Sequence, residues 1–476
     1  MLAAAVRWTG GGRKLRAMSG APSLPTRPPE RSMSRRGGLP PGSRATLRNT
    51  YGFAVRPYET MRDMRVRYGD PFFATALNGE LVLTAEPELI RELFAVRDPD
   101  LFAVFATGAT TPLLGSHSLL TMFGEPHRRE RKLLMPSFHG ERMRAYGTVI
   151  VEAARRAFGG LRPDEPFIAI ERTTEISLEA IVRAVFGVEE VERVAEWQRV
   201  IRATLEAAKP MFLFSKMTQR APFGLGPWAA YLRASSEADR LLFEQIERTR
   251  GRTAGREDIL SLMIDARYED GGAMTDEHIR DELRTLLIAG HETTAITLAW
   301  ALYAVHRHLE VKATLLAELD ALGPDAAPDE LARLPYLQAV IDETLRRYPV
   351  VDTVFRVLRK PWSFGGYELQ PGITIGAMIL LVHRREDLYP DPDAFRPDRF
   401  LEGKPRPHEY LSFGGGHRRC IGAAFSHYES CLALATVLRE RELELCEPGE
   451  VAVSRRNVTL GPKGGVRMRM VGSRSS

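Results

Sequence analysis

The stretch from Ser412 to Gly422 reads SFGGGHRRCIG, and it gathers unusual backbone freedom around a single thiol. The consecutive glycines Gly414–Gly416 permit positive φ angles and close approach of the backbone. The residues after Cys420, GAAFSHYESCLALATVLRE, carry the apolar periodicity of a helix. A thiol at the N-terminal end of a helix, with Arg418 and Arg419 beside it, has a lowered pKa and favours the thiolate. The stretch therefore predicts a nucleophile or a metal ligand at Cys420.

The chain holds only three cysteines, Cys420, Cys431 and Cys446. An odd and sparse count argues against a disulfide framework and favours a reducing compartment. We expect Cys431 and Cys446 to be buried small hydrophobes, because both lie on or beyond the helix that follows Cys420 and give no zinc spacing. A single thiolate is sufficient as the protein ligand of a haem iron.

The spacing Phe413-x-x-Gly416-x-Arg418-x-Cys420-x-Gly422 resembles the haem-binding loop of the cytochrome P450 superfamily. The resemblance implies that Cys420 is the axial ligand of the iron in haem b and that Phe413 shields its sulfur. It also implies that Arg418 pairs with a haem propionate and that Gly422 lets the helix and the porphyrin approach. Backbone N–H groups around a shielded thiolate tune its donor strength.

A second stretch, LLIAGHETTAITLAW (Leu286–Trp300), lies inside a long apolar segment. We expect one helix from about Asp276, with Thr275 as N-cap, to about His308, because acids in the first turn suit the helix dipole. Glycine and two threonines are poor helix formers at its centre, and a buried charge there is costly. We therefore expect a kinked helix with a polar notch rather than a plain buried helix.

This notch is similar to the oxygen-activation segment of the same family, with Ala289 and Gly290 followed by Glu292 and Thr293. The resemblance implies that Thr293 hydrogen-bonds dioxygen at the iron and that Glu292 relays protons from solvent. It implies that Gly290 leaves room over the iron.

Glu343 and Arg346 stand three residues apart in PYLQAVIDETLRRYPVV, a spacing that puts both charges on one helical face. They resemble the family's E-x-x-R pair, with Arg399 as the third member. The resemblance implies a buried structural cluster in which the loss of one member leaves an unpaired charge.

His127 and Arg131 lie one helical turn apart in GEPHRRERKLLMPSF, so two donors converge on one carboxylate. The resemblance implies that both bind a haem propionate and that Arg356 is another propionate partner. The alternative for His127 is a basic solvated helix face. Arg128 and Lys132, with the distant His417 and Arg419, are then expected to form part of a docking surface.

The chain has 476 residues and a net charge of +5, and the charge is unevenly distributed. The first 50 residues hold ten Lys/Arg and one acid, so the remainder is slightly acidic and the basic character does not indicate nucleic-acid binding. Residues 1–43, rich in Pro, Gly, Ser and Arg, are expected to be a disordered tail. Alternatively, Met1 comes from an upstream start codon, and Met18 or Met33 is the true first residue.

Residues 44–476 are expected to form one cytochrome P450 domain that is mainly α with small β-sheets, with the haem between the long helix and the cysteine loop. Strand patterns are few: Gly79–Thr84, a hairpin within Trp362–Ile379 and another within Val451–Met470. No apolar run approaches the roughly 18 residues of a membrane span, so we expect a cytoplasmic bacterial enzyme without a membrane anchor.

The resemblance implies a haem-thiolate monooxygenase that inserts one atom of O2 into a hydrophobic substrate. Electrons from NAD(P)H are expected to arrive through a separate ferredoxin or flavodoxin with its reductase. Peroxide-driven chemistry, isomerisation or dehydration on the same fold remains an alternative, and a haem-binding sensor is a second class. Relatives that use peroxide typically lack the acid–alcohol pair, which is intact here at Glu292 and Thr293.

The substrate is expected to be a fatty acid, a terpenoid or a secondary-metabolite scaffold, because the segments that would wall the pocket are mostly apolar. Those segments are Phe102–Leu120, the surroundings of Phe212, Phe214 and Met217, Leu287–Thr294, Val351–Phe355 and Thr459–Leu460.

Overall fold

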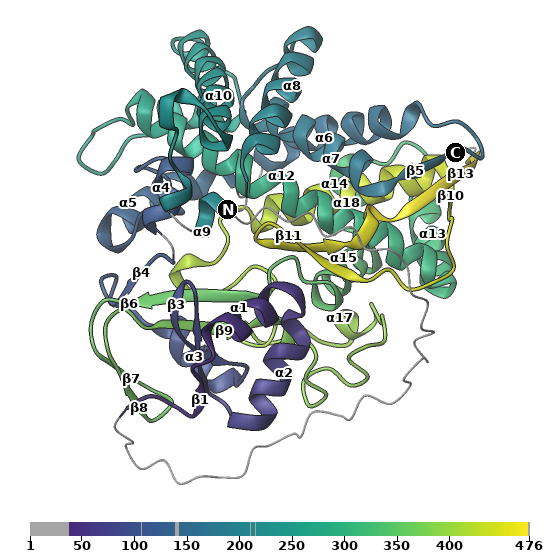
Figure 1. The fold of residues 1–476 in the computed structure, drawn as a ribbon. Coiled ribbons are helices and arrows are strands. Elements are labelled where there is room, and N and C mark those ends of the chain that lie inside the picture. The colour runs from purple at the N-terminus through teal and green to yellow at the C-terminus, as the bar shows by residue number, and fades with distance from the viewer. Residues whose placement is uncertain (1–37, 106, 139–141, 210, 215, 475–476) are drawn as a thin grey trace.

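The computed structural model describes residues 38–474 except for 106, 139–141, 210 and 215, and helices dominate it (Figure 1). Most of the expected N-terminal tail, residues 1–37, lies outside the described residues. Its last residues do not follow the expectation of disorder. Gly42 and Ser43 form strand β1 (Gly42–Ser43) and pair in parallel with Phe73 and Ala74. The folded chain therefore begins before residue 44.

The helices of the first half alternate with short strands and loops. They are α1 (Thr46–Val55), α2 (Pro57–Tyr68), α3 (Pro87–Ala95), α4 (Thr107–Leu114), α5 (Gly124–Leu134), α6 (Arg142–Gly159), α7 (Ala169–Ala180), α8 (Val191–Ala207), α9 (Met211–Phe214) and α10 (Pro227–Thr249). The second half holds α11 (Ile259–Asp265), α12 (Asp276–Arg307), α13 (Leu309–Ala321), α14 (Pro328–Ala332), α15 (Pro335–Arg347), α16 (Ile379–Val382), α17 (Arg399–Glu402) and α18 (Ala423–Glu440).

The strands form one larger sheet and three small ones among the described residues. The six-stranded sheet has the order β1, β2 (Phe72–Ala76), β3 (Gly79–Thr84), β9 (Thr374–Met378), β6 (Thr353–Leu358) and β4 (Phe102–Ala103). The others are β10 (Arg441–Leu445), β13 (Arg467–Ser473) and β5 (Pro166–Ile168), the hairpin β11 (Val453–Arg456) and β12 (Thr459–Pro462), and the hairpin β7 (Trp362–Phe364) and β8 (Tyr367–Leu369). The strand at Gly79–Thr84 and both hairpins confirm the expectations from sequence.

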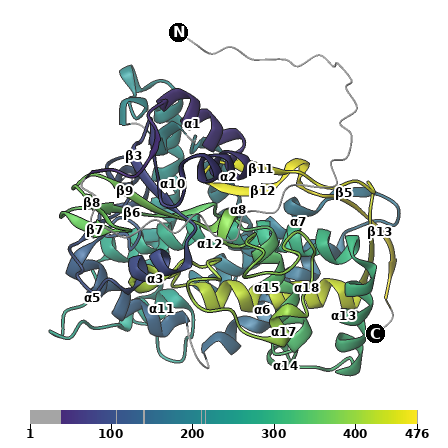
Figure 2. The same ribbon diagram turned by 90° about the horizontal axis from the view of Figure 1, so that it is seen from below.

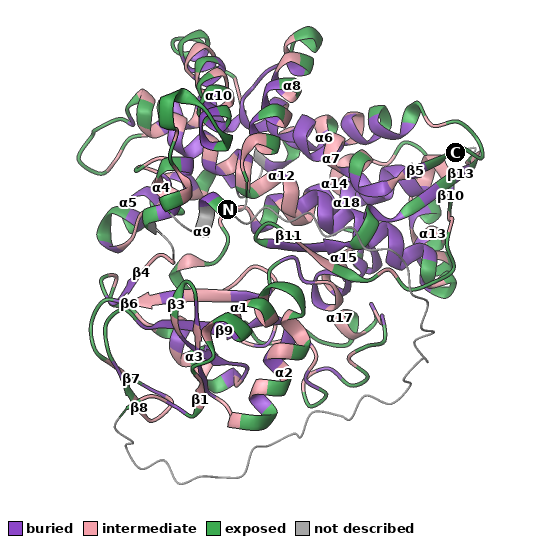
Figure 3. Cartoon of the chain, viewed as in Figure 1, coloured by how far each residue is buried: buried purple, intermediate pink, exposed green. Residues whose placement is uncertain are grey.

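The helices and the larger sheet occupy different parts of the molecule (Figures 1 and 2). The sheet lies with α1, α2 and α3 on one side, and the helices α6 to α15 and α18 make up the other. The burial pattern in Figure 3 shows the main core among these helices, around α12 and α18. The mainly α architecture with small sheets is the one expected.

Helix α12 runs through this core and matches the expected bounds. The hydroxyl of Thr275 accepts a hydrogen bond from the N–H of His278 at 3.3 Å, and Asp276 and Glu277 occupy the first turn. This is an N-cap with favourable charges, as the sequence indicates. The helix is continuous through Gly290 and the two threonines that follow it. None of the helices in the described part of the chain is long and apolar enough to cross a membrane.

Candidate active site

The cysteine loop is closed by its own backbone. The N–H of Cys420 donates to the carbonyl of Phe413 at 2.9 Å, and Gly422 precedes the first turn of α18. A Cβ at Gly415 would lie 2.1 Å from the ring of Phe94. Gly416 has φ +66° and would place a Cβ 2.7 Å from the Phe94 carbonyl oxygen. Glycine is thus required where the loop lies against α3.

The thiol of Cys420 is exposed even though protein atoms surround it. Burial raises its pKa above the ordinary value, while the N–H of Gly422 and the charges of Arg131 and Arg419 lower it. The lowering groups are of the expected kind, but the expected net lowering is wrong because desolvation is the larger effect. A metal cation bound to the sulfur would overcome this raised pKa, because a coordinating thiol is deprotonated by the metal.

A group of basic side chains lies around this loop, and we call it the basic cluster. Its members are His127, Arg131, Arg356, His417 and Arg418. They come from α5, β6 and the cysteine loop, so the fold brings together all the residues for which a propionate role was expected. The rings of His127 and His417 meet edge to face with centroids 6.1 Å apart.

The members of the basic cluster lower one another's pKa. Burial, then the charge of Arg418, brings the pKa of Arg356 to about 10, and burial, then Arg131, brings that of Arg418 to about 10. Burial and the neighbouring guanidinium groups lower the pKa of His127 to about 3 and that of His417 to about 4. Both imidazoles are therefore neutral at pH 7, and mutual repulsion is the second cause after desolvation.

In the described part of the chain, no carboxylate pairs with the guanidinium groups of this cluster. Arg356 donates to the carbonyls of Phe355 (2.9 Å) and Gly415 (3.2 Å), and Arg418 donates to the carbonyl of Met122. The Nε of Arg418 is buried without a partner. Three buried or half-buried cations without an anion form a site for an anionic group.

Open space adjoins both α12 and the cysteine loop. Ala289 is exposed at the middle of α12, although its neighbours Leu287 and His291 are buried. Gly422 would meet no atom within 4 Å if it carried a Cβ. A flat group with two carboxylates and one iron fits this donor set, because the basic cluster supplies cations and Cys420 supplies one soft ligand.

The polar notch of α12 holds Thr293 and Glu292 in different ways. The hydroxyl of Thr293 donates to the carbonyl of Ala289 at 2.8 Å, within its own helix. The carboxylate of Glu292 lies 3.8 Å from the Nε of Arg456, which belongs to β11. Burial raises the pKa of Glu292, and Arg456 and the hydroxyl of Thr459 counteract that rise. The arrangement provides a half-buried acid with a proton affinity above that of a solvated glutamate.

Gly290 faces the segment Ile181–Val185, which extends α7. A Cβ at Gly290 would lie 3.2 Å from the Cδ1 of Ile181. The absence of a side chain thus allows α12 to pack closely against this segment. Room over the iron remains a prediction for this residue.

In the cluster of Glu343, Arg346 and Arg399, each charged group pairs with an opposite charge of the protein. Glu343 and Arg346 are both 0% exposed, and their side chains join through two hydrogen bonds of 2.6 and 2.8 Å. The Nε of Arg399 reaches Glu343 at 3.2 Å. Arg346 also donates to three backbone carbonyls, those of His383, Pro392 and Ala394. Every charge here has its partner within the protein.

Comparisons with known proteins decide the family. The family model described as Cytochrome P450 matches residues 40–466. This chain belongs to the cytochrome P450 family. It is 32% identical over 458 residues to "Putative cytochrome P450 137" of Mycobacterium tuberculosis, covering 95% of this chain and 91% of that protein. It is 35% identical over 456 residues to "Putative cytochrome P450 135B1" of Mycobacterium bovis, covering 92% of each.

Solved structures of cytochromes P450 have the same fold. The retinoic acid-bound cyanobacterial CYP120A1 matches with a TM-score of 0.79 at 22% identity, over 92% of this chain and 100% of that chain. The cytochrome P450DA haem domain matches with a TM-score of 0.80 at 24% identity, over 93% and 99%. The P450 is thus a haem-thiolate monooxygenase, an oxidoreductase with haem as its cofactor.

Several features escaped the sequence analysis because they depend on contacts between distant segments. Arg456, the partner of Glu292, lies 164 residues further along the chain. Phe102, expected in the pocket wall, is buried in the core of the larger sheet against Trp362 at 5.5 Å. Met217 is 73% exposed.

Proposed function

We propose that this P450 uses dioxygen and two electrons from a separate ferredoxin or flavodoxin to insert one oxygen atom into a hydrophobic molecule. The observation that carries this proposal is the pair of Glu292 and Thr293 beside the exposed Ala289. A reaction that consumes dioxygen needs protons delivered into a site from which bulk water is excluded. Peroxide already carries its protons, so a peroxide-driven enzyme has less use for this pair.

In this proposal Cys420 would ligate the iron, while Arg131, Arg356 and Arg418 would hold the two propionates. When bound, the haem supplies the iron at which dioxygen is reduced and its O–O bond split. The carboxyl group of Glu292 holds a proton more readily than a solvated carboxylate does. In this proposal Glu292 would pass that proton on beside Thr293, and the charge of Arg456 would favour the ionised form of Glu292 afterwards.

The chemistry of the substrate follows from the apolar side chains near α12. Leu113 and Leu114 of α4, Phe212 of α9 and Trp228 of α10 form one buried cluster with Tyr231, against which Ile288 of α12 packs. Phe105, in the segment before α4, stacks on Phe355 of β6 with ring centroids 4.9 Å apart. These surfaces favour a fatty acid, a terpenoid or another large apolar scaffold over a charged substrate.

The docking surface for the electron donor is proposed on the outer face of α5 and the cysteine loop. The exposed Arg128 and Lys132 pair there with the exposed Glu125 and Glu269. Exposed pairs of this kind contribute only about 0–1 kcal/mol, so an acidic partner exchanges for them at little cost. Arg419 is exposed as well. Reduction by an acidic partner is therefore expected to slow with added salt.

The test is turnover of a fatty acid and a terpenoid panel by the haem-loaded P450, with surrogate ferredoxin and reductase under dioxygen or with hydrogen peroxide alone. We expect oxygenated product under dioxygen, and Thr293→Ala to divert electrons to peroxide. Thr297→Ala is the matched control, since Thr297 makes the same type of bond to a helix carbonyl one turn later. Product formation only with peroxide, or unchanged coupling in Thr293→Ala, would overturn the proposal.

A further inference from the structure

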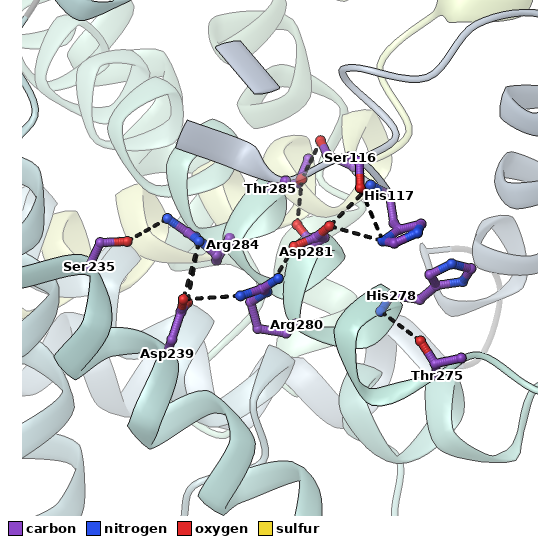
Figure 4. Close-up of polar contacts among 12 residues, drawn as sticks. Ser116, His117, Ser235, Asp239, Thr275, His278, Arg280, Asp281, Arg284 and Thr285 are labelled. Carbon is purple, nitrogen blue, oxygen red and sulfur yellow. Dashed lines mark hydrogen bonds and ion pairs between the residues drawn. The ribbon is translucent and has the colours of Figure 1, made fainter. Parts of the chain in front are cut away.

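A network of polar side chains outside the haem site joins three segments of the P450 (Figure 4). Its centre is Asp281 of α12, whose side chain is 1% exposed. Figure 4 shows Asp281 between His117 on one side and Arg280 on the other. The Nε of Arg280 lies 2.8 Å from Asp281, and its guanidinium donates to Asp239 of α10 at 3.0 Å. One carboxylate therefore links α12 with α10 and with the loop that follows α4.

The loop after α4 is held by α12 and α10 rather than by secondary structure. The backbone N–H of His117 donates to the Oδ2 of Asp281 at 3.0 Å, and the Nδ1 of His117 lies 3.2 Å from the same oxygen. The hydroxyl of Thr285 donates to that of Ser118 at 2.6 Å. Gly115, at φ +94°, lies so close that a Cβ there would meet the Asp281 carboxylate at about 2 Å. Three polar contacts at the adjacent residues His117 and Ser118 thus bind this loop to α12.

Arg284 extends the network toward the apolar cluster over α12. It donates to the hydroxyl of Tyr231 at 3.1 Å and to that of Ser235 at 2.5 Å. Tyr231 in turn donates to the carbonyl of Leu113, the penultimate residue of α4, at 3.3 Å. The end of α4 is therefore linked to α12 through Tyr231 of α10.

The other end of the same loop reaches the basic cluster, because the carbonyl of Met122 accepts a hydrogen bond from Arg418. The loop consequently spans from the apolar cluster of Leu113 and Phe212 to the haem-binding residues.

We propose that Asp281 is a positioning residue that holds residues 113–118 closed against the substrate side of the haem, and thereby slows the departure of large apolar ligands. The inference rests on the proposed function, because it takes the space beside α12 to be the substrate pocket. The ring of His278 lies against that of His117, with centroids 3.8 Å apart, and covers the outer side of this contact.

The test compares three variants of the haem-loaded P450 that remove different parts of the contact. Asp281→Asn removes the charge, and His117→Ala removes only the ring and keeps the backbone bond. Ser118→Ala removes the contact of the loop with Thr285, whose hydroxyl also has the carbonyl of Asp281 as an acceptor. Asp276→Asn is the matched control, because Asp276 is an exposed acid of the same helix that pairs with Arg250.

Two measurements are made on each variant: hydrogen exchange of the amides 113–121, and dissociation rates of two haem ligands, the bulky apolar azole clotrimazole and the small imidazole. We expect Asp281→Asn to speed exchange and clotrimazole dissociation about fivefold, because a hydrogen bond to a charged acceptor is roughly twice as strong as one to the neutral amide oxygen that replaces it. Imidazole dissociation should stay within about twofold, since one such bond to the loop is not part of its binding. His117→Ala and Ser118→Ala should give smaller effects of the same kind.

Unchanged exchange and unchanged clotrimazole dissociation in Asp281→Asn would overturn the inference. Equal acceleration for clotrimazole and imidazole would also overturn it, because it would indicate general loosening of the haem site. If wild type responds spectrally to neither azole, the proposed function fails instead, and hydrogen exchange still decides whether Asp281 holds the loop.

Discussion

Two groups of buried or half-buried arginines in this P450 differ in whether carboxylates of the protein neutralise their charge. Arg346 and Arg399 share the carboxylate of Glu343, and Arg346 saturates its remaining donors with backbone carbonyls. In the basic cluster, Arg131 and Arg418 face other cations, and burial together with that repulsion lowers the pKa of Arg418. The first group is complete within the protein, whereas the second has no carboxylate partner among the described residues, and we propose that the haem propionates supply the anions.

The difference separates residues that make the fold from residues that make the site. Removing a member from a complete buried set leaves an unpaired charge, so the cost falls on folding. Removing a cation from a set of mutually repelling cations reduces the repulsion in the protein without haem, so the loss appears in cofactor binding and not in folding. Removing an arginine from one group or from the other can thus have opposite effects on the stability of the protein without haem.

The largest expected effect is that of Glu343→Gln. It leaves Arg346 buried without its counter-charge and should reduce the free energy of unfolding by about 3–5 kcal/mol. Urea unfolding at pH 7 measures this. The control Glu444→Gln breaks an exposed pair with Arg469 and should cost less than about 1 kcal/mol. Equal losses in the two variants would remove the distinction between complete and exposed charge sets.

Glu429 is the opposite case to the basic cluster, because it is a buried acid without a cationic partner. Burial raises its pKa to about 8, and its Oε1 has no partner among the described groups. The folded state therefore binds more protons than the unfolded state between pH 4.5 and 8, so the stability contribution of Glu429 falls as pH rises through this window. Above pH 8 the effect levels off.

Glu429→Gln should abolish that part of the pH dependence. We expect the variant to gain about 1–3 kcal/mol over wild type between pH 5 and pH 9, the range for an uncompensated buried group. Urea unfolding across this range measures the gain. A constant difference at all pH values would mean that Glu429 has no raised pKa.

Arg131→Leu should have the opposite sign to Glu343→Gln. The protein without haem should be as stable as wild type or more so, because a half-buried repelling charge is removed. Haem should leave at least about tenfold faster, since a hydrogen bond to a charged propionate is lost. Transfer of haem to an acceptor apoprotein measures the rate. Arg128→Leu, on the exposed side of α5, is the control, and an equal acceleration there would contradict the assignment.

The smallest expected effect is that of Arg456→Gln on Glu292. Arg456 is 43% exposed and lowers the pKa of Glu292, so its removal should raise that pKa by less than about one unit, in keeping with the weakness of exposed pairs. Infrared titration of the carboxyl band is the measurement. A fall in the pKa would show that Arg456 does not stabilise the ionised form.

The sequence predicts the mainly α fold and the bounds of α12. Thr275 as N-cap of α12 follows from neighbouring residues, so a local pattern is sufficient, whereas the need for glycine at Gly415 and Gly416 comes from the distant Phe94. The raised pKa of Cys420 was not predictable, because desolvation depends on the packing of the whole loop against α3 and α5. The contacts of Asp281 with His117 and of Glu292 with Arg456 join segments more than 160 residues apart, and nothing in either segment alone indicates them.

The carbon monoxide difference spectrum of the reduced protein tests the central claim most directly. If the basic cluster and Cys420 hold a thiolate-ligated haem, the Soret band will show the strong red shift of thiolate ligation. A band at the position of histidine-ligated or thiol-ligated haem would contradict thiolate ligation by Cys420, and no haem at all would also contradict the claim that a cofactor completes the charges of Arg131, Arg356 and Arg418.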